Sequence, residues 1–218
     1  MRPRLHQLSA LGQSVWIDYL SRELIESGAL SNAIDEDAVV GVTSNPTIFE
    51  EALGRGHAYD EQIAASSERD AESVFLSLAL RDVAAACDLL RPVWESTQAG
   101  DGYVSIEVEP NLADNTQATI AQATHFHEAI ARPNLLVKIP ATDAGVPAIE
   151  EMTARGHSIN VTLIFSPALT RTRRDREVRR LLQQAFCGES RTSADSCRPR
   201  PDPAPIARCP RATVARGR

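Results

Sequence analysis

The 218-residue sequence has little lysine: Lys138 stands alone against 22 arginines. It also lacks any apolar run of the roughly 18 residues that a membrane-spanning helix needs. Its amino terminus has no apolar segment typical of a secretory signal. No G-x-G-x-x-G or P-loop follows a strand-like run, which argues against a nucleotide-binding protein. These absences favour a cytoplasmic protein without membrane contact.

Cysteine is also scarce, with four residues in the chain. Only Cys87 lies in the well-patterned part, and the others are Cys187, Cys197 and Cys209. This placement excludes a recognisable disulfide framework or metal-ligand spacing. Hydrophobic residues make up 43% of the chain and charged residues 24%, a balance typical of one globular domain with a substantial core.

The composition changes abruptly near Ser166. Residues 167–218 hold 13 arginines and five acidic residues, whereas residues 1–166 hold 10 basic and 24 acidic residues. The tail also contains six of the 13 prolines. Apart from a basic helix that Thr170–Ala185 could form, we expect the tail to be disordered. It lacks interleaved aromatic residues, so we do not expect nucleic-acid binding, and DNA read out of frame explains its composition more simply.

Residues 1–166 alternate strand-like and helical segments. The expected strands are Gln13–Asp18, Ala38–Asn45, Tyr103–Glu109, Leu135–Pro140 and Ser158–Phe165. The expected helices are Ser21–Ser27, Thr47–Leu53, a long region over Tyr59–Ser96, Asn115–Ala131 and Val146–Arg155. Strands separated by helices predict a parallel sheet of βα units, which a doubly wound sheet and a TIM barrel would both satisfy.

Lys138 lies inside the apolar run Asn134–Thr142, between Val137 and Ile139. An ammonium group is costly to bury there. Burial disfavours the charged form of an amine, and the neutral amine attacks carbonyl carbon to form a Schiff base. The alternative is that an arginine-rich composition simply retained one lysine.

The other strands carry polar residues near their carboxyl ends. Because side chains alternate with period two, each set shares one face: Gly41, Thr43 and Asn45; Ser105, Glu107 and Glu109; Lys138; and Asn160 and Thr162, with Asp18 closing the first strand. In a closed βα barrel these faces converge at the carboxyl ends of the strands. The alternative is that Ser, Thr and Asn merely form caps and turns.

An amine, two carboxylates, two carboxamides and several hydroxyls suit carbonyl chemistry through an imine. In that interpretation Asp18 and Glu107 move protons, while the Asn and Thr groups orient substrate hydroxyls and water.

Four segments carry a family resemblance: GVTSNPTIFEEAL (41–53), VSIEVEP (104–110), NLLVKIPAT (134–142) and NVTLIFS (160–166). In this order they resemble transaldolase, in the longer subfamily found in actinobacteria. The resemblance implies an incomplete TIM (β/α)8 barrel with about five βα units. It also implies a class I aldolase of the pentose phosphate pathway, which moves a dihydroxyacetone unit from sedoheptulose 7-phosphate to glyceraldehyde 3-phosphate without a metal or organic cofactor.

The resemblance assigns a role to each matching residue. Lys138 would form the Schiff base, Asp18 would exchange the proton of the hydroxyl beside the breaking bond, and Glu107 with Thr162 would hold water. The substrate-binding residues would be Asn45, Asn160, Thr43 and Ser105.

The family pattern ends near Ser166. Transaldolases continue through strands six to eight, with a Ser-Pro-Phe-type strand and phosphate-binding arginines that residues 167–218 do not match. We therefore expect residues 1–166 to be the amino-terminal part of a barrel and the tail to be truncated or frame-shifted sequence. Three readings stay open at this point: a transaldolase acting on phosphorylated sugars, another Schiff-base aldolase, or an inactive fragment. The oligomeric state is not predicted.

Overall fold

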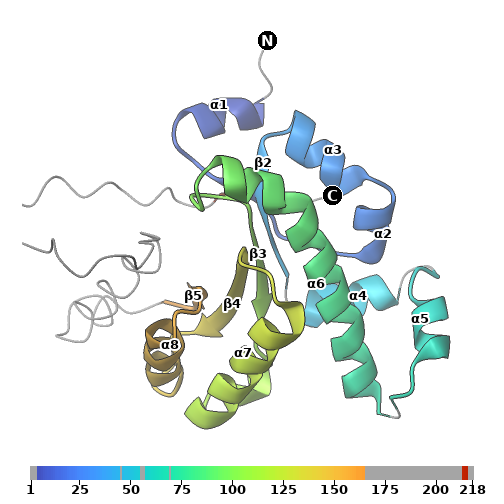
Figure 1. Cartoon of the computed structure of the whole chain (residues 1–218), viewed down its shortest axis with the longest axis vertical. Helices are drawn as coiled ribbons and strands as arrows, with labels where there is room; N and C mark the ends of the chain where they lie inside the picture. The colour runs from blue at the N-terminus through green and yellow to red at the C-terminus, as the bar shows by residue number, and fades with distance from the viewer. Residues whose placement is uncertain (1–3, 45, 55–56, 69, 165–212, 216–218) are drawn as a thin grey trace, which may run out of the picture.

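The computed structural model describes residues 4–44, 46–54, 57–68, 70–164 and 213–215. Strands and helices alternate along the chain (Figure 1). The strands are β1 (Val15–Ile17), β2 (Val39–Thr43), β3 (Tyr103–Glu107), β4 (Leu135–Pro140), β5 (Ile159–Thr162) and β6 (Thr213–Ala215). The helices are α1 (Arg4–Ala10), α2 (Arg22–Glu26), α3 (Ala29–Glu36), α4 (Pro46–Leu53), α5 (Asp60–Ala65), α6 (Ala71–Ser96), α7 (Thr116–Ile130) and α8 (Gly145–Ala154), with a 3-10 turn, η1, at Pro110–Leu112.

The sheet has the order β5-β4-β3-β2-β1-β6, and every neighbouring pair is parallel. From β1 to β5, each strand lies beside the next strand in the sequence. A doubly wound sheet would instead reverse its strand order at an interior strand. Among the described residues, β1 to β5 form a curled half-barrel, which confirms the prediction of an incomplete barrel with about five βα units (Figure 1).

The short strand β6 pairs with the other side of β1, with Trp16 opposite Val214. The expectation of a tail without strands differs from the structure at these three residues, where Thr-Val-Ala has a β-prone composition. The rest of the predicted tail, including the basic helix expected at Thr170–Ala185, lies outside the described residues.

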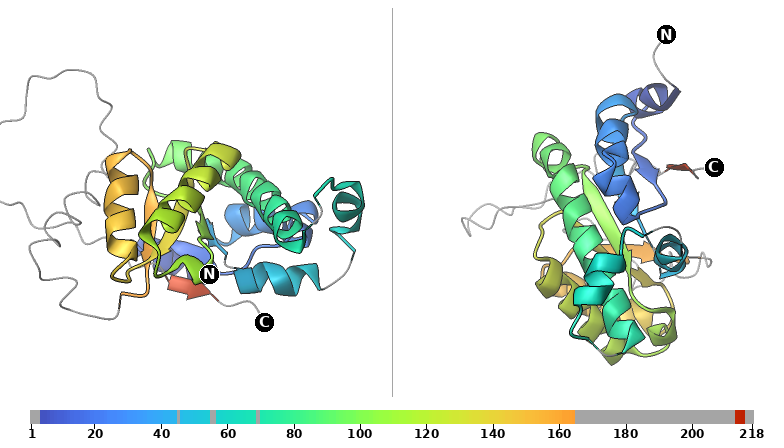
Figure 2. Two further views of the ribbon diagram at one scale, coloured as in Figure 1. Left: turned by 90° about the horizontal axis from the view of Figure 1, so that it is seen from below. Right: turned by 90° about the vertical axis from the view of Figure 1, so that its right-hand side faces the viewer.

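The core lies between the sheet and the helices α6, α7 and α8. These three helices run along one face of the sheet (Figures 1 and 2). Strand residues with alternate spacing, such as Val104, Val137 and Ile139, are fully buried on that face and belong to the same cluster as Val83 and Phe126 of the helices. Burying each large side chain contributes about 1.5–3 kcal/mol. The remaining positions of each strand therefore point to the inner, concave face.

Three helical features depart from the sequence prediction, and the first is α1, which was not predicted. The region Tyr59–Ser96 is split into α5 and α6, because Asp70 caps α6 by accepting a 2.8 Å hydrogen bond from the backbone of Ser73. The helix α3 was not predicted. Gly28, at φ 76°, is the joint between α2 and α3 rather than an end of helical structure.

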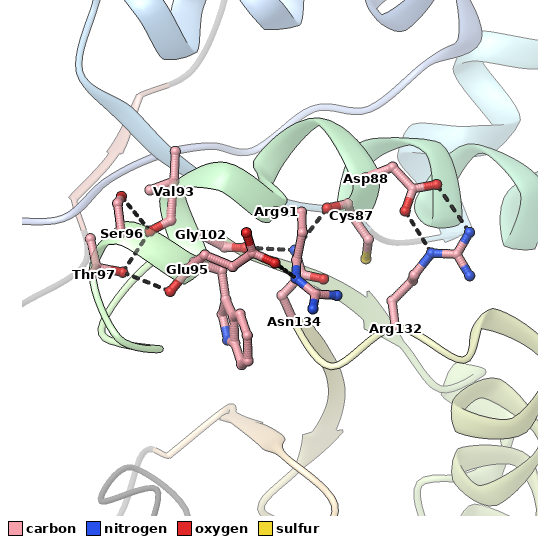
Figure 3. A network of polar contacts seen from close by, with 11 residues as sticks. Cys87, Asp88, Arg91, Val93, Glu95, Ser96, Thr97, Gly102, Arg132 and Asn134 are labelled. Atoms are coloured by element: carbon pink, nitrogen blue, oxygen red, sulfur yellow. Dashed lines mark hydrogen bonds and ion pairs between the residues drawn. The ribbon is translucent and has the colours of Figure 1, made fainter.

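A buried side chain connects α6 to the starts of strands β3 and β4. Asn134, directly before β4, is fully buried, and its Nδ2 donates to the carbonyl oxygens of Cys87 (2.9 Å) and Gly102 (2.8 Å) (Figure 3). Beside it, the Arg132 guanidinium donates to both carboxylate oxygens of Asp88. The entries into β3 and β4 are thereby fixed against one helix.

No helix within the described residues is long and apolar enough to cross a membrane.

Candidate active site

The strand register brings the predicted polar residues into rows on the inner face. Glu107 of β3 is opposite Lys138 of β4, which is opposite Asn160 of β5. Thr43 of β2 is opposite Ser105, which precedes Glu107 by two residues in β3. Since opposite residues in a parallel sheet point to the same face, the structure places these five side chains together.

Lys138 and Glu107 form an ion pair, with 2.9 Å between Nζ and Oε2. Their side chains are 14% and 19% exposed. The neighbours Val137 and Ile139 are fully buried on the opposite, helix-covered face. A pair with so little exposure is weakly screened by salt and solvent. Its carboxylate is within hydrogen-bond reach of the amine, so it is positioned to accept a proton from it.

The hydroxyl and amide groups lie around this pair. The Asn160 Nδ2 donates to the Ser105 Oγ at 3.0 Å, which links β5 to β3 across the concave face. The Oγ1 of Thr43 is buried and has no hydrogen-bond partner within the described residues. A buried hydroxyl in that condition needs an explanation, and a substrate hydroxyl would satisfy it.

Two other predicted site residues, Asp18 and Thr162, lie where their strands end. Asp18 directly follows β1 and is half-buried, and Ile17 before it is paired with Val42. Thr162 is the last residue of β5, two positions beyond Asn160 and therefore on the same face. Both lie at the carboxyl edge of the sheet. Asn45 lies outside the described residues.

Sequence reasoning missed two features near this edge. Ser44 is fully buried, and its Oγ has no partner within the described residues. Arg22, at the start of α2, is 5% exposed and paired with Asp82 of α6. A pattern of strand residues gives no signal for either. An arginine in a predicted helix is ordinarily a surface residue.

Comparisons with known proteins identify the family of this chain. The profile of the family Transaldolase/Fructose-6-phosphate aldolase matches residues 15–175. A protein named Transaldolase from Mycobacterium ulcerans (strain Agy99) is 52% identical over 167 residues, which cover 76% of this chain and 45% of that protein. One of the same name from Mycobacterium tuberculosis (strain ATCC 25618 / H37Rv) is 52% identical over 166 residues, covering 75% of this chain and 44% of that protein.

This chain thus spans less than half the length of the curated relatives that it matches. The matched region nevertheless covers most of the chain and contains every candidate site residue. On this evidence the chain belongs to the transaldolase/fructose-6-phosphate aldolase family of enzymes.

Proposed function

We propose that this chain carries out transaldolase chemistry in the cytoplasm, within the pentose phosphate pathway. It would transfer a dihydroxyacetone unit from sedoheptulose 7-phosphate to glyceraldehyde 3-phosphate through a Schiff base on Lys138. The observation that carries this proposal is the Lys138–Glu107 pair, an amine and a carboxylate 2.9 Å apart on the concave face. Membership of the family supports the class of enzyme.

Imine formation uses the pair directly. The neutral amine of Lys138 attacks the ketose carbonyl carbon, a C=N bond forms, and the carbonyl oxygen leaves as water. Glu107, within hydrogen-bond reach of the amine, first takes a proton from the Lys138 ammonium and then gives it to the departing oxygen; that oxygen takes its second proton from the nitrogen, so a protonated imine remains. Thr162, at the end of β5, would hold that water together with Glu107.

Carbon–carbon cleavage needs a second base. Asp18 would take the proton from the hydroxyl on the fourth carbon, the bond between the third and fourth carbons breaks, and its electron pair moves toward the imine nitrogen. An aldehyde leaves, and an enamine of dihydroxyacetone stays on Lys138. Attack on the acceptor aldehyde reverses these steps, and Asp18 returns the proton. The substrate hydroxyls would be bound by Asn45, Asn160, Thr43 and Ser105.

The protonated imine is itself the electron sink, so these steps require no metal or organic cofactor. The described residues form a half-barrel, and the chain spans less than half of its curated relatives. This partial coverage favours an alternative hypothesis, in which the chain is an inactive fragment.

The test is a comparison of substrates with the purified 218-residue chain. We expect fructose 6-phosphate and erythrose 4-phosphate to give sedoheptulose 7-phosphate, and deoxyribose 5-phosphate to stay intact. Cleavage of deoxyribose 5-phosphate instead would identify a different Schiff-base aldolase. A chain that unfolds cooperatively, but converts neither the fructose 6-phosphate mixture nor deoxyribose 5-phosphate, would favour the hypothesis of an inactive fragment.

A further inference from the structure

A buried polar cluster lies at the end of the segment that follows Asp18. It joins the first residue of α2 (Arg22), the residue before α5 (Tyr59) and the middle of α6 (Asp82). All three side chains are buried, with exposed fractions of 5%, 3% and 1%. They come from parts of the chain 23 and 60 residues apart.

Hydrogen bonds join all three side chains of the cluster. The Arg22 Nε and Nη2 donate to Oδ1 of Asp82 at 2.8 and 2.7 Å. The Tyr59 hydroxyl donates to Oδ2 of Asp82 at 2.8 Å and accepts from the backbone N–H of Arg22 at 2.9 Å. The guanidinium carbon also lies 4.7 Å from the centre of the Tyr59 ring. The cluster therefore fixes both the side chain and the backbone of Arg22.

Stability alone does not account for this arrangement. Burial raises the pKa of the Asp82 carboxyl, and the hydrogen bonds from Arg22 and Tyr59 oppose that rise. Well-packed apolar residues often stabilise a protein as well as a buried ion pair does, because both charges lose their hydration. What apolar residues would not provide is a set of directional bonds that holds one backbone position.

The position held is close to Asp18 in the sequence. Only Tyr19, Leu20 and Ser21 separate Asp18 from Arg22, and Leu20 is fully buried. On the other side of Asp18, Ile17 is paired with β2. The segment is therefore fixed at one end by the sheet and at the other by the cluster, which leaves the Asp18 backbone little freedom.

We propose that the Arg22–Asp82–Tyr59 cluster is a positioning device that holds Asp18 in place for the proton transfer of carbon–carbon cleavage. This inference depends on the proposed function. The three residues do not touch the reacting atoms. They act through the short segment between β1 and α2, whereas Lys138 is carried by β4 and Glu107 by β3, outside that segment.

The two steps can be separated in a single turnover of the full chain with fructose 6-phosphate. Borohydride quenching at timed intervals reduces the imine on Lys138. Mass spectrometry then distinguishes a six-carbon adduct, formed before cleavage, from a three-carbon adduct, formed after it. For Tyr59→Phe and Asp82→Asn we expect the total adduct to form at the wild-type rate. Conversion from six to three carbons should slow about 10- to 100-fold, the scale of a misplaced catalytic group.

Tyr103→Phe is the matched control. It also removes a buried tyrosine hydroxyl, which donates to the Ala99 carbonyl at 2.8 Å, but at the amino end of β3. We expect this variant to convert its adduct at the wild-type rate. The inference is overturned if the cluster variants convert normally, or if they slow both steps in proportion to lost folded protein, as a purely structural role would. A wild-type chain that forms no adduct overturns the proposed function and this inference with it.

Discussion

His127 makes the stability of the folded chain depend on pH. It lies near the end of α7 and stacks on His157, with 4.2 Å between the ring centres and 23° between the ring planes. Its Nε2 is buried without a partner among the described residues. The pKa of His127 is lowered from 6.5 to about 4, mainly by burial and secondly by the neighbouring His157, while a hydrogen bond with the backbone of Ser158 opposes both effects.

The direction of this pH dependence follows from which state of the chain, folded or unfolded, binds the proton. Between pH 6.5 and about 4 the unfolded chain protonates this histidine and the folded chain does not. The contribution of His127 is therefore complete above pH 6.5 and is lost as the pH falls toward 4. At about 1.4 kcal/mol per unit of pKa, the full difference corresponds to about 3 kcal/mol. Because the ring is partly exposed, we expect solvent screening to reduce the loss to about 1–2 kcal/mol.

Urea unfolding at about pH 7.5 and about pH 4.5 measures this loss. We expect the wild type to lose about 1–2 kcal/mol more of its free energy of unfolding between these pH values than His127→Gln does. The control is His125→Gln, a substitution of an exposed histidine on the same helix, which should keep the wild-type pH dependence. Equal losses in the wild type and His127→Gln would refute the reasoning.

Two further predictions concern the site and its support. Glu107→Gln removes the carboxylate that is 2.9 Å from Lys138, so transaldolase turnover should fall about a hundredfold with little change in unfolding free energy; unchanged sedoheptulose 7-phosphate formation would contradict it. Asn134→Ala leaves the buried carbonyl oxygens of Cys87 and Gly102 without their donor. At about 1–3 kcal/mol for each unpaired group, urea unfolding should show a loss of roughly 2–4 kcal/mol, and wild-type stability would rule out the bridging role.

The inner-face residues were predictable because strand alternation is a local rule. Period two placed Ser105, Glu107, Lys138 and Asn160 on one face without knowledge of the fold, and the register confirms that they lie in neighbouring rows. The choice between a barrel and a doubly wound sheet was different, since both follow from the same βα rhythm. That choice rested on the family resemblance, and the sequential strand order supports it.

The supporting contacts were not predictable, because they join residues that are distant in sequence. Arg22 and Asp82 each fit the pattern of an ordinary helical surface position, and only the packing of α2 against α6 makes them buried partners. The helix α3 was missed for a local reason. The sequence predicts a helix only before Gly28, over Ser21–Ser27, but a left-handed glycine can also join two consecutive helices.

The central claim is that the amine of Lys138 forms the imine, and covalent trapping tests it most directly. Lys138 is the only lysine, so a reduced adduct on a lysine side chain has one possible location. After incubation of the full chain with fructose 6-phosphate and borohydride, we predict a sugar adduct on the peptide that contains Lys138, and its loss in Lys138→Met. A cooperatively folded chain that is modified only at its amino terminus, or not at all, would contradict the account.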